Sequence, residues 1–254
     1  MNRMIMGMAT AAAFAAAGIG TMGSNAAAAG SGDPCPMTLP QGSDSVTLDP
    51  ADFVSHIDNE YSPMPQGARW VYRESDIEGN ASHVVVKVLD RTKPILGIDA
   101  TVVHDTLSHN GHIVENTFDW YGQDVCGDVW YLGENTREFK NGQVVSREGS
   151  WEAGVAGALA GVVMAADPSV GLTYRQEYKA GEAEDSAAVL SLDEQAKVPA
   201  GHFTKLVLTK EFTPVEPRVL EYKFYAKGVG LVLAIGISGG SDREELIRYH
   251  VPTT

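Results

Sequence analysis

The chain is poor in basic residues, and this scarcity limits the partners it can have. Its 254 residues include 19 Lys and Arg against 33 Asp and Glu, a formal net charge of −14, without a basic cluster. Binding to nucleic-acid phosphates depends on such clusters, so the composition argues against nucleic acid as a partner. An acidic excess is typical of soluble exported proteins, and it also attracts cations.

Sequence motifs of several catalytic classes are missing as well. There is no H-E-x-x-H or C-x-x-C spacing, and no G-x-S-x-G motif leads from a strand into a helix. Gly228 and Gly230 lie within strand-like sequence, whereas a phosphate-binding loop opens a helix. We therefore expect no cofactor.

Cysteine is nearly absent, and the two that occur predict one bond. Cys35 and Cys126 form the pair, and in an oxidising compartment an isolated pair usually becomes a disulfide. The alternative is a catalytic thiol, but neither cysteine has a His beside it in the sequence. We predict a Cys35–Cys126 disulfide that fixes the N-terminal part of the chain to the sheet.

The N-terminus predicts export. Residues 1–29 have the features of a signal peptide, because Arg3 precedes an alanine-rich apolar run that ends in small residues. The run is too short to span a membrane. Residues 30–57, rich in Pro, Gly, Ser and Asp, predict an extended leader with one short helical turn near residue 50, and residues 58–254 a single β domain. We expect a secreted or periplasmic, extracytoplasmic protein that does not span a membrane; its oligomeric state is left open.

Turn signals divide the domain into short strands. Asn110-Gly111 and Asn141-Gly142 predict two-residue hairpin turns, and Gly127 a slightly longer loop. Helix is scarce, and the three glycines of segment 153–166 predict a loop with at most a short helix. The predicted fold is mainly β, a strongly curved antiparallel sheet or half-barrel meander of roughly eight to ten strands with little helix.

The aromatic hairpin around Cys126 predicts two surfaces. If Tyr121 faces Tyr131, simple alternation places Trp120 opposite Leu132 and Phe118 opposite Glu134. One surface then carries Val114, Phe118, Trp120, Trp130 and Leu132, with Glu134 beside them, and is the better core. The other carries Glu115, Asp119, Tyr121, Val129 and Tyr131. Of these, we predict that Glu115, Asp119, Tyr121 and Tyr131 form a concave ligand-binding face, with buried packing as the alternative.

Several motifs together carry a family resemblance. They are FDWYGQD at 118–124, GDVWYLGE at 127–134, GSWEAG at 149–154, TYRQEY at 173–178, VPAGHF at 198–203 and YAKGVGLV at 225–232. The chain resembles, over about residues 58–249, a group of exported bacterial proteins of uncharacterised function, and the later motifs are similar to TapB-like β domains. The resemblance implies a secreted, curved antiparallel sheet and supplies no catalytic residues.

The residues offer two other kinds of candidate site. Asp119, Glu134 and Glu152 offer carboxylates for glycoside hydrolysis, but the favoured explanation of Asp119 and Glu134 is hydrogen bonding to turn backbone or pairing with Arg137, Arg147 or Arg175. His109 and His112 flank a hairpin turn with His104 on the same strand, but they lack a recognised further ligand, so we predict no metal site.

The sequence leaves the choice between enzyme and binding protein open. We expect a non-catalytic exported protein that binds an apolar or amphipathic small molecule, or a cell-envelope component, on the concave face of the sheet. The alternatives are an extracellular hydrolase of glycoside type that uses paired carboxylates, and a purely structural envelope protein.

Overall fold

The structure, a computed structural model, describes residue 35 and residues 38–240 and 242–252. The predicted signal peptide, residues 1–29, lies outside the described residues, as does the start of the leader. Within them the 3-10 helix η1 (Pro50–Asp52) is the only helix, at the position where the sequence predicts a helical turn. No helix in this part of the chain is long and apolar enough to cross a membrane.

The described chain forms one antiparallel sheet, which confirms the predicted fold class. Sixteen strands take part, against the roughly eight to ten expected, because several short strands add to the long hairpins. The strands are β1 (Phe53–Val54), β2 (Arg69–Ser75), β3 (Ala81–Ile95), β4 (Ile98–His109), β5 (His112–Asp124), β6 (Val129–Lys140), β7 (Gln143–Ser146), β8 (Trp151–Glu152), β9 (Leu159–Met164), β10 (Thr173–Arg175), β11 (Glu177–Tyr178), β12 (Ser186–Val198), β13 (Gly201–Phe212), β14 (Leu220–Ala226), β15 (Gly230–Ser238) and β16 (Arg243–His250).

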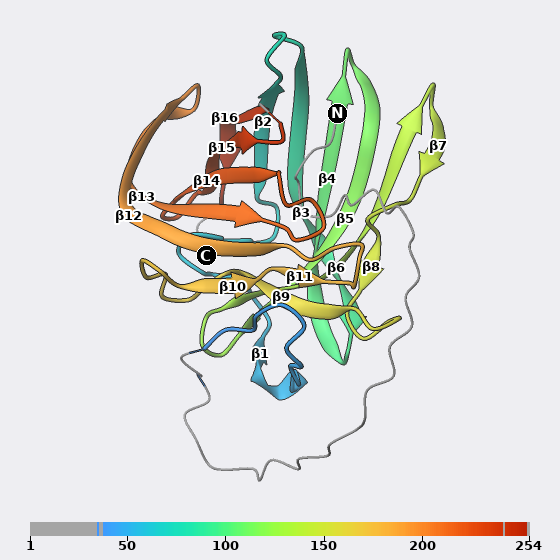
Figure 1. The fold of residues 1–254 in the computed structure, drawn as a ribbon, viewed down its shortest axis with the longest axis vertical. Coiled ribbons are helices and arrows are strands. Elements are labelled where there is room, and N and C mark those ends of the chain that lie inside the picture. The colour runs from blue at the N-terminus through green and yellow to red at the C-terminus, as the bar shows by residue number, and fades with distance from the viewer. Residues whose placement is uncertain (1–34, 36–37, 241, 253–254) are drawn as a thin grey trace.

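The sheet curls until it is nearly a closed barrel. Its order is β10-β12-β13-β14-β15-β16-β2-β3-β4-β5-β6-β9-β11, and β12 to β15 cross in front of β2 to β6 in Figure 1. β10 pairs with β12 at one end of this order and β11 pairs with β9 at the other. Since only Gln176 separates β10 from β11, one short segment joins both ends and leaves a single seam.

A buried arginine holds this seam. Arg175 is 1% exposed. Its Nε and Nη2 donate to the carbonyl oxygen of Ala160 in β9, at 3.2 and 2.7 Å, and its Nη1 donates to the carbonyls of Gly42 and Asp44, each at 2.7 Å. The guanidinium therefore bonds strand and leader together through carbonyl groups alone.

The described part of the leader packs against the sheet. β1 pairs with β5, and the ring of Phe53 covers Gly122, where a Cβ atom would lie 3.0 Å from it. The disulfide between Cys35 and Cys126 is present, with Cα atoms 5.3 Å apart. Such a bond persists in oxidising compartments, which agrees with an extracytoplasmic location.

The predicted hairpins form, but the register of the aromatic hairpin needs a correction. Tyr121 faces Tyr131 as predicted, whereas Trp120 faces Gly133, Phe118 faces Asn135 and Asp119 faces Glu134. The cause is a β-bulge at Leu132, which adds one residue to β6 and shifts every pair beyond it. Glu134 consequently shares a face with Asp119, contrary to the simple alternation.

Segment 153–166 also differs from its prediction as a loop. It contains β9, whose residues are almost entirely buried. The glycines that argue against a helix have another reason here, because a Cβ atom at Gly161 would lie 2.4 Å from the carbonyl of Gln176. Gly161 allows β9 to approach the seam segment directly, and an unbroken apolar run is typical of a strand buried on both faces.

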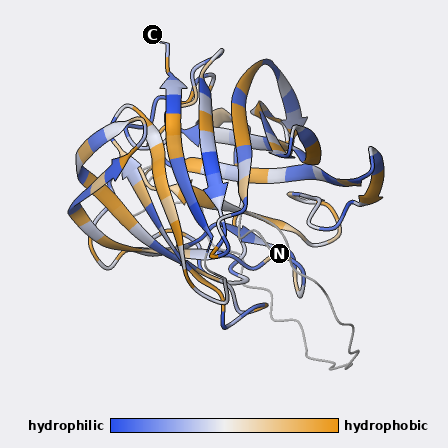
Figure 2. Ribbon diagram, turned by 90° about the horizontal axis from the view of Figure 1, so that it is seen from above, coloured by the Kyte–Doolittle hydropathy of each residue, from blue (hydrophilic) through white to orange (hydrophobic). Residues whose placement is uncertain are grey.

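Both faces of the aromatic hairpin are buried, whereas the sequence predicts one open face. Polar and apolar residues alternate along many of the strands (Figure 2). On the outer face the ammonium of Lys93 lies 3.6 Å from the ring centre of Trp120, and Trp130 Nε1 donates to Asp124 at 2.8 Å. On the inner face Tyr121 stacks on Tyr131. The inner face is enclosed because the sheet curls over it.

The bulge predicts that replacing Gly133 by alanine lowers the stability more than the same replacement at Gly142. Gly133 has a φ of +130°, and a Cβ atom there would lie 2.4 Å from the carbonyl oxygen of Trp151. Gly133→Ala should lower the free energy of unfolding by about 3 kcal/mol or more, because backbone must move. Gly142→Ala, at an open turn with φ +75°, should cost only about 1 kcal/mol. Urea unfolding of both variants measures the difference, and equal losses would contradict the packing at the bulge.

Candidate functional site

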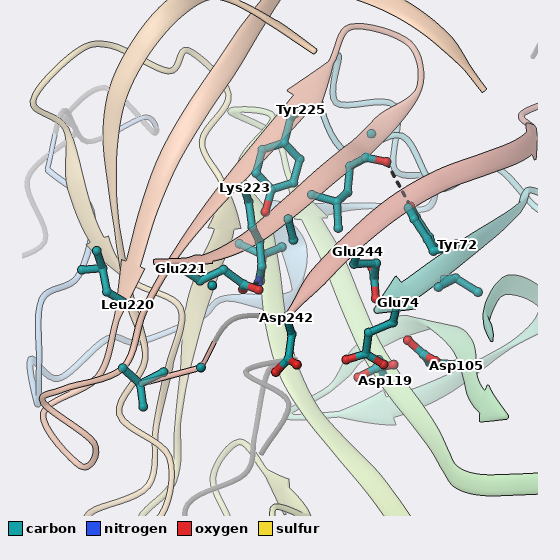
Figure 3. Close-up of a pocket in the computed structure, with 18 of the residues that line it drawn as sticks. Tyr72, Glu74, Asp105, Asp119, Leu220, Glu221, Lys223, Tyr225, Asp242 and Glu244 are labelled. Carbon is teal, nitrogen blue, oxygen red and sulfur yellow. Dashed lines mark hydrogen bonds and ion pairs between the residues drawn. The ribbon is translucent and has the colours of Figure 1, made fainter. Parts of the chain in front are cut away.

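The concave side of the curled sheet forms an open cavity of about 1240 Å³. Its wall is formed by the inward residues of β2 to β5 on one side and of β14 to β16 on the other, with Val163 of β9 between them. The segments 62–64 and 215–219 complete the lining together with Gly239, Gly240 and Asp242. Figure 3 shows side chains from these strands converging on the same space.

Acidic side chains outnumber basic ones on the cavity wall. The seven acidic residues are Glu74, Asp105, Asp119, Glu216, Glu221, Asp242 and Glu244, and the two basic residues are Arg218 and Lys223. Glu74 and Asp119 are more than nine-tenths buried. Acidic groups therefore predominate among the charged residues of the wall.

Two tyrosines of the wall, Tyr72 and Tyr121, lie close enough to these carboxylates for their pKa values to respond. Burial raises the pKa of Tyr72, and the nearby Glu244 and Asp105 raise it further. Burial also raises the pKa of Tyr121, with Asp119 and Glu134 adding to the effect. Ionisation of a phenol would place a further negative charge beside the carboxylates, which is unfavourable, so these phenols stay neutral.

Lys223 is held in the wall by two carboxylates. Its ammonium lies 2.5 Å from Glu211 and 3.3 Å from Glu221. Burial alone would lower the pKa of Lys223, but these two carboxylates outweigh burial and raise the pKa well above its usual value. Tyr225 also donates to Glu211, at 3.2 Å. Lys223 is thus a paired, structural cation.

The predicted ligand-binding residues lie together, although only two of the four reach the cavity. Asp119 and Tyr121 line it, whereas Tyr131 and Glu115 do not. Tyr131 is fully buried beside them, stacked on Tyr121 with ring centres 5.0 Å apart, and its hydroxyl donates to Asp119 at 2.8 Å. Tyr131 therefore supports the wall and orients Asp119.

The three carboxylates named for hydrolysis do not meet at the cavity. Glu134 is 3% exposed and lies opposite Asp119, but it does not line the cavity. Burial raises its pKa well above the usual value, and Asp119 and Glu177 raise it further. Glu152 forms an ion pair with Lys93, whose ammonium lies over Trp120 on the outer face.

The histidines lie outside the cavity. His109 and His112 are cross-strand neighbours as the turn predicts. His109 Nδ1 lies 3.1 Å from Ser82 Oγ, while His104 stacks on Phe118 and bonds to Asn116. Across the described ranges, no group of three His, Cys, Asp or Glu side chains is arranged to hold a metal ion.

Sequence reasoning missed most of the cavity wall. Glu74 and Asp105 follow apolar residues at two-residue spacing, as in Trp70-x-Tyr72-x-Glu74. This spacing is the signal that could have placed them on the inner face, because residues two apart in a strand share a side.

A second buried acidic group lies at the seam. Glu177 is fully buried, accepts a hydrogen bond from Trp151 Nε1 at 2.8 Å, and has no partner for its Oε1. Burial and the neighbouring Asp185 raise the pKa of Glu177 well above its usual value. Burial raises the pKa of Asp185 to about 6.

Comparison with known proteins adds little to this description. No family model and no curated protein matches the chain. Among solved structures, it is similar to a protein from Bacteroides fragilis described as exported with a YmcC-like fold, at 16% identity and a TM-score of 0.46, and to a protein from Parabacteroides distasonis described as a lipoprotein, at 14% and 0.42. Each match covers 76% of this chain and 100% of the other. The similarity to TapB-like β domains stays a prediction from the motifs.

The buried carboxyls predict a stability that falls as pH rises. Glu134, Glu177 and Asp185 all have pKa values raised in the folded state, so the folded chain binds more protons than the unfolded one. The stability that these protonated carboxyls contribute is fully present below about pH 4, the pKa of carboxyls in the unfolded chain. It is lost as the pH rises through the folded-state pKa values, about 6 for Asp185. The free energy of unfolding should fall by on the order of 2 kcal/mol between pH 5 and pH 8.

Two variants test whether the buried carboxyl at the seam causes part of this fall in stability. Glu177→Gln removes one titrating group and keeps an oxygen for Trp151, so the fall between pH 5 and pH 8 should become smaller. Glu182→Gln, at an exposed position of the adjoining turn, should leave the fall unchanged. Denaturant unfolding at both pH values measures it, and an undiminished fall in Glu177→Gln would contradict the assignment.

Proposed function

We propose that this protein is a non-catalytic, extracytoplasmic binding protein that holds an amphipathic small molecule inside its curved sheet. The observation that carries the proposal is the cavity of about 1240 Å³. Protein interiors normally leave few voids larger than a water molecule, and small-molecule sites occupy about 300–1,000 Å³. The cavity is therefore large enough to hold a small molecule.

The composition of the wall favours an amphipathic ligand. Trp70, Val86 and Leu231 offer apolar surface, while the carboxylates of the wall lie within the same enclosure. One ligand in this cavity can therefore meet apolar surface and polar groups together. A component of the cell envelope with an apolar tail and a polar head has the same chemistry.

The geometry supports binding better than hydrolysis. Glycoside hydrolysis requires two carboxyl groups on either side of one bond of the substrate. Asp119 reaches the cavity, but Glu134 and Glu152 are not among its lining residues. This arrangement favours a binding role for the cavity over hydrolysis by Asp119, Glu134 or Glu152.

Filling the cavity tests the proposal. Ala234 is buried in the wall, and Ala234→Phe places a ring in the cavity without changing its charge. The wild-type protein should bind the neutral apolar probe N-phenyl-1-naphthylamine with a rise in fluorescence, and the variant should bind it about tenfold more weakly or worse. The matched control is Ile237→Phe, on the same strand but 46% exposed and outside the lining, which should bind as the wild type does.

Circular dichroism checks that each variant is folded before its probe binding is compared with that of the wild-type protein. Absence of probe binding to the wild-type protein would reject the proposal. Equal binding by the wild-type protein and a folded Ala234→Phe variant would also reject it, because the probe would then sit elsewhere.

A further inference from the structure

We infer that the outer face of the neighbouring strands β16, β2, β3 and β4 docks on a membrane surface that carries anionic lipid head groups. This face is on the opposite side of the strands from the cavity, so the inference goes beyond the proposed function. It comes from the sign of the charges on the face, from cations that stand opposite one another across the strands, and from a buried guanidinium nitrogen without a hydrogen-bond partner.

Alternation along the four strands separates this outer face from the cavity wall. The cavity is lined by Tyr72 of β2, Val86 of β3, Asp105 of β4 and Glu244 of β16. Neighbouring residues of a strand project to opposite sides, and cross-strand partners share a side. The outward positions therefore include a set of basic and imidazole side chains, here called the basic face: Arg69, Arg73, His83, Lys87, His104, Arg243, Arg248 and His250.

Basic residues predominate on this face, which is the reverse of the chain as a whole. The chain has 33 acidic and 19 basic residues, yet Glu245 is the one acidic residue at the outward positions of these four strands. It pairs with Arg73 at 2.6 Å and with Arg243 at 3.0 Å. Arg91 extends the face, with its guanidinium 4.9 Å from the ring centre of Phe118, and Asp90 precedes it in the β3 bulge. The strands thus assemble a basic cluster that the linear sequence does not contain.

One row of the basic face places cations beside cationic or titratable groups. His250, Arg69, Lys87 and His104 are successive cross-strand partners from β16 to β4. Like charges directly opposite each other destabilise a sheet, so stability alone does not favour the Arg69–Lys87 pair. The Nε of Arg69 is buried and has no hydrogen-bond partner. An anionic partner on this face would compensate the row.

A membrane surface fits both the shape and the charge of the basic face. Its residues come from adjacent strands of one sheet, so they form an extended surface that can meet many lipid phosphates at once. Each Lys or Arg near an anionic lipid surface strengthens binding by about fivefold. Charges act over about 8 Å at physiological ionic strength, so the acidic residues elsewhere on the molecule are largely screened. An extracytoplasmic protein encounters such surfaces.

Vesicles that differ in head-group charge test the inference on the wild-type protein. One set contains phosphatidylcholine alone, and the other contains equal parts of phosphatidylcholine and phosphatidylglycerol. Sedimentation of the vesicles measures the bound fraction of the protein. At low ionic strength, we expect binding to the anionic vesicles to be about tenfold tighter or more. Added sodium chloride should weaken this binding steeply, because salt screens the charges.

Variants locate the contact. Lys87→Gln and Arg248→Gln each remove one exposed positive charge from the basic face and should each weaken binding to the anionic vesicles about fivefold. The matched control Arg218→Gln removes the same charge from the connection between β13 and β14, where Arg218 lines the cavity, and should bind as the wild type does. Circular dichroism checks that each variant is folded, and either basic-face variant suffices if the other is not.

The outcomes bear on this inference and leave the proposed function to its own probe. Equal binding to the two kinds of vesicle, or binding to neither, overturns the inference. An equal loss in all three variants overturns the assignment to the basic face. Binding of a DNA duplex that depends on Lys87 and Arg248, without binding to the anionic vesicles, overturns the choice of a lipid surface.

Discussion

The hydrogen bonds of one buried guanidinium join the two ends of the sheet at its seam. Arg175 bonds to β9 and to the leader while its own strand pairs with β12, so three parts of the chain meet at one side chain. Charge-assisted hydrogen bonds to carbonyl groups have defined directions, which fixes the seam in one geometry. A sheet that curls without this fastening would leave two free edges and an open concave surface. With it, the same surface becomes the interior of a nearly closed barrel.

The barrel interior combines two requirements that oppose each other. Stability favours apolar packing, yet carboxyls lie along the inner strands and at the seam, several with raised pKa values. Burying such groups costs free energy unless protons or cations compensate them. The Lys223 ammonium between Glu211 and Glu221 compensates one side of the cavity.

The sequence predicted the fold class and the hairpin turns, because these follow from local chemistry. Asn110-Gly111 and Asn141-Gly142 both adopt positive φ angles, as the turn type requires. The bulge at Leu132 could not be predicted in this way, since it depends on how Gly133 fits against Trp151. That single residue moved Glu134 to the face of Asp119. The strand hidden in 153–166 and the cavity wall of Glu74 and Asp105 likewise depend on contacts between distant segments, which residue patterns do not record.

The pairing of β2 with β16 gives the fold an unusual relation between chain order and space. Seven residue pairs join Arg69–Ser75 to Arg243–His250, so the first long strand and the last strand are neighbours in the middle of the sheet. Cutting the chain after β11 and linking its two ends would turn the topology into a nearly continuous meander. In the natural order, β2 is made early, but the edge that later binds β16 has no partner until the final hairpin exists. Folding can therefore be completed only after the final hairpin has been synthesised. Between the synthesis of β2 and that of β16, the unpaired edge of β2 needs protection from pairing with other chains.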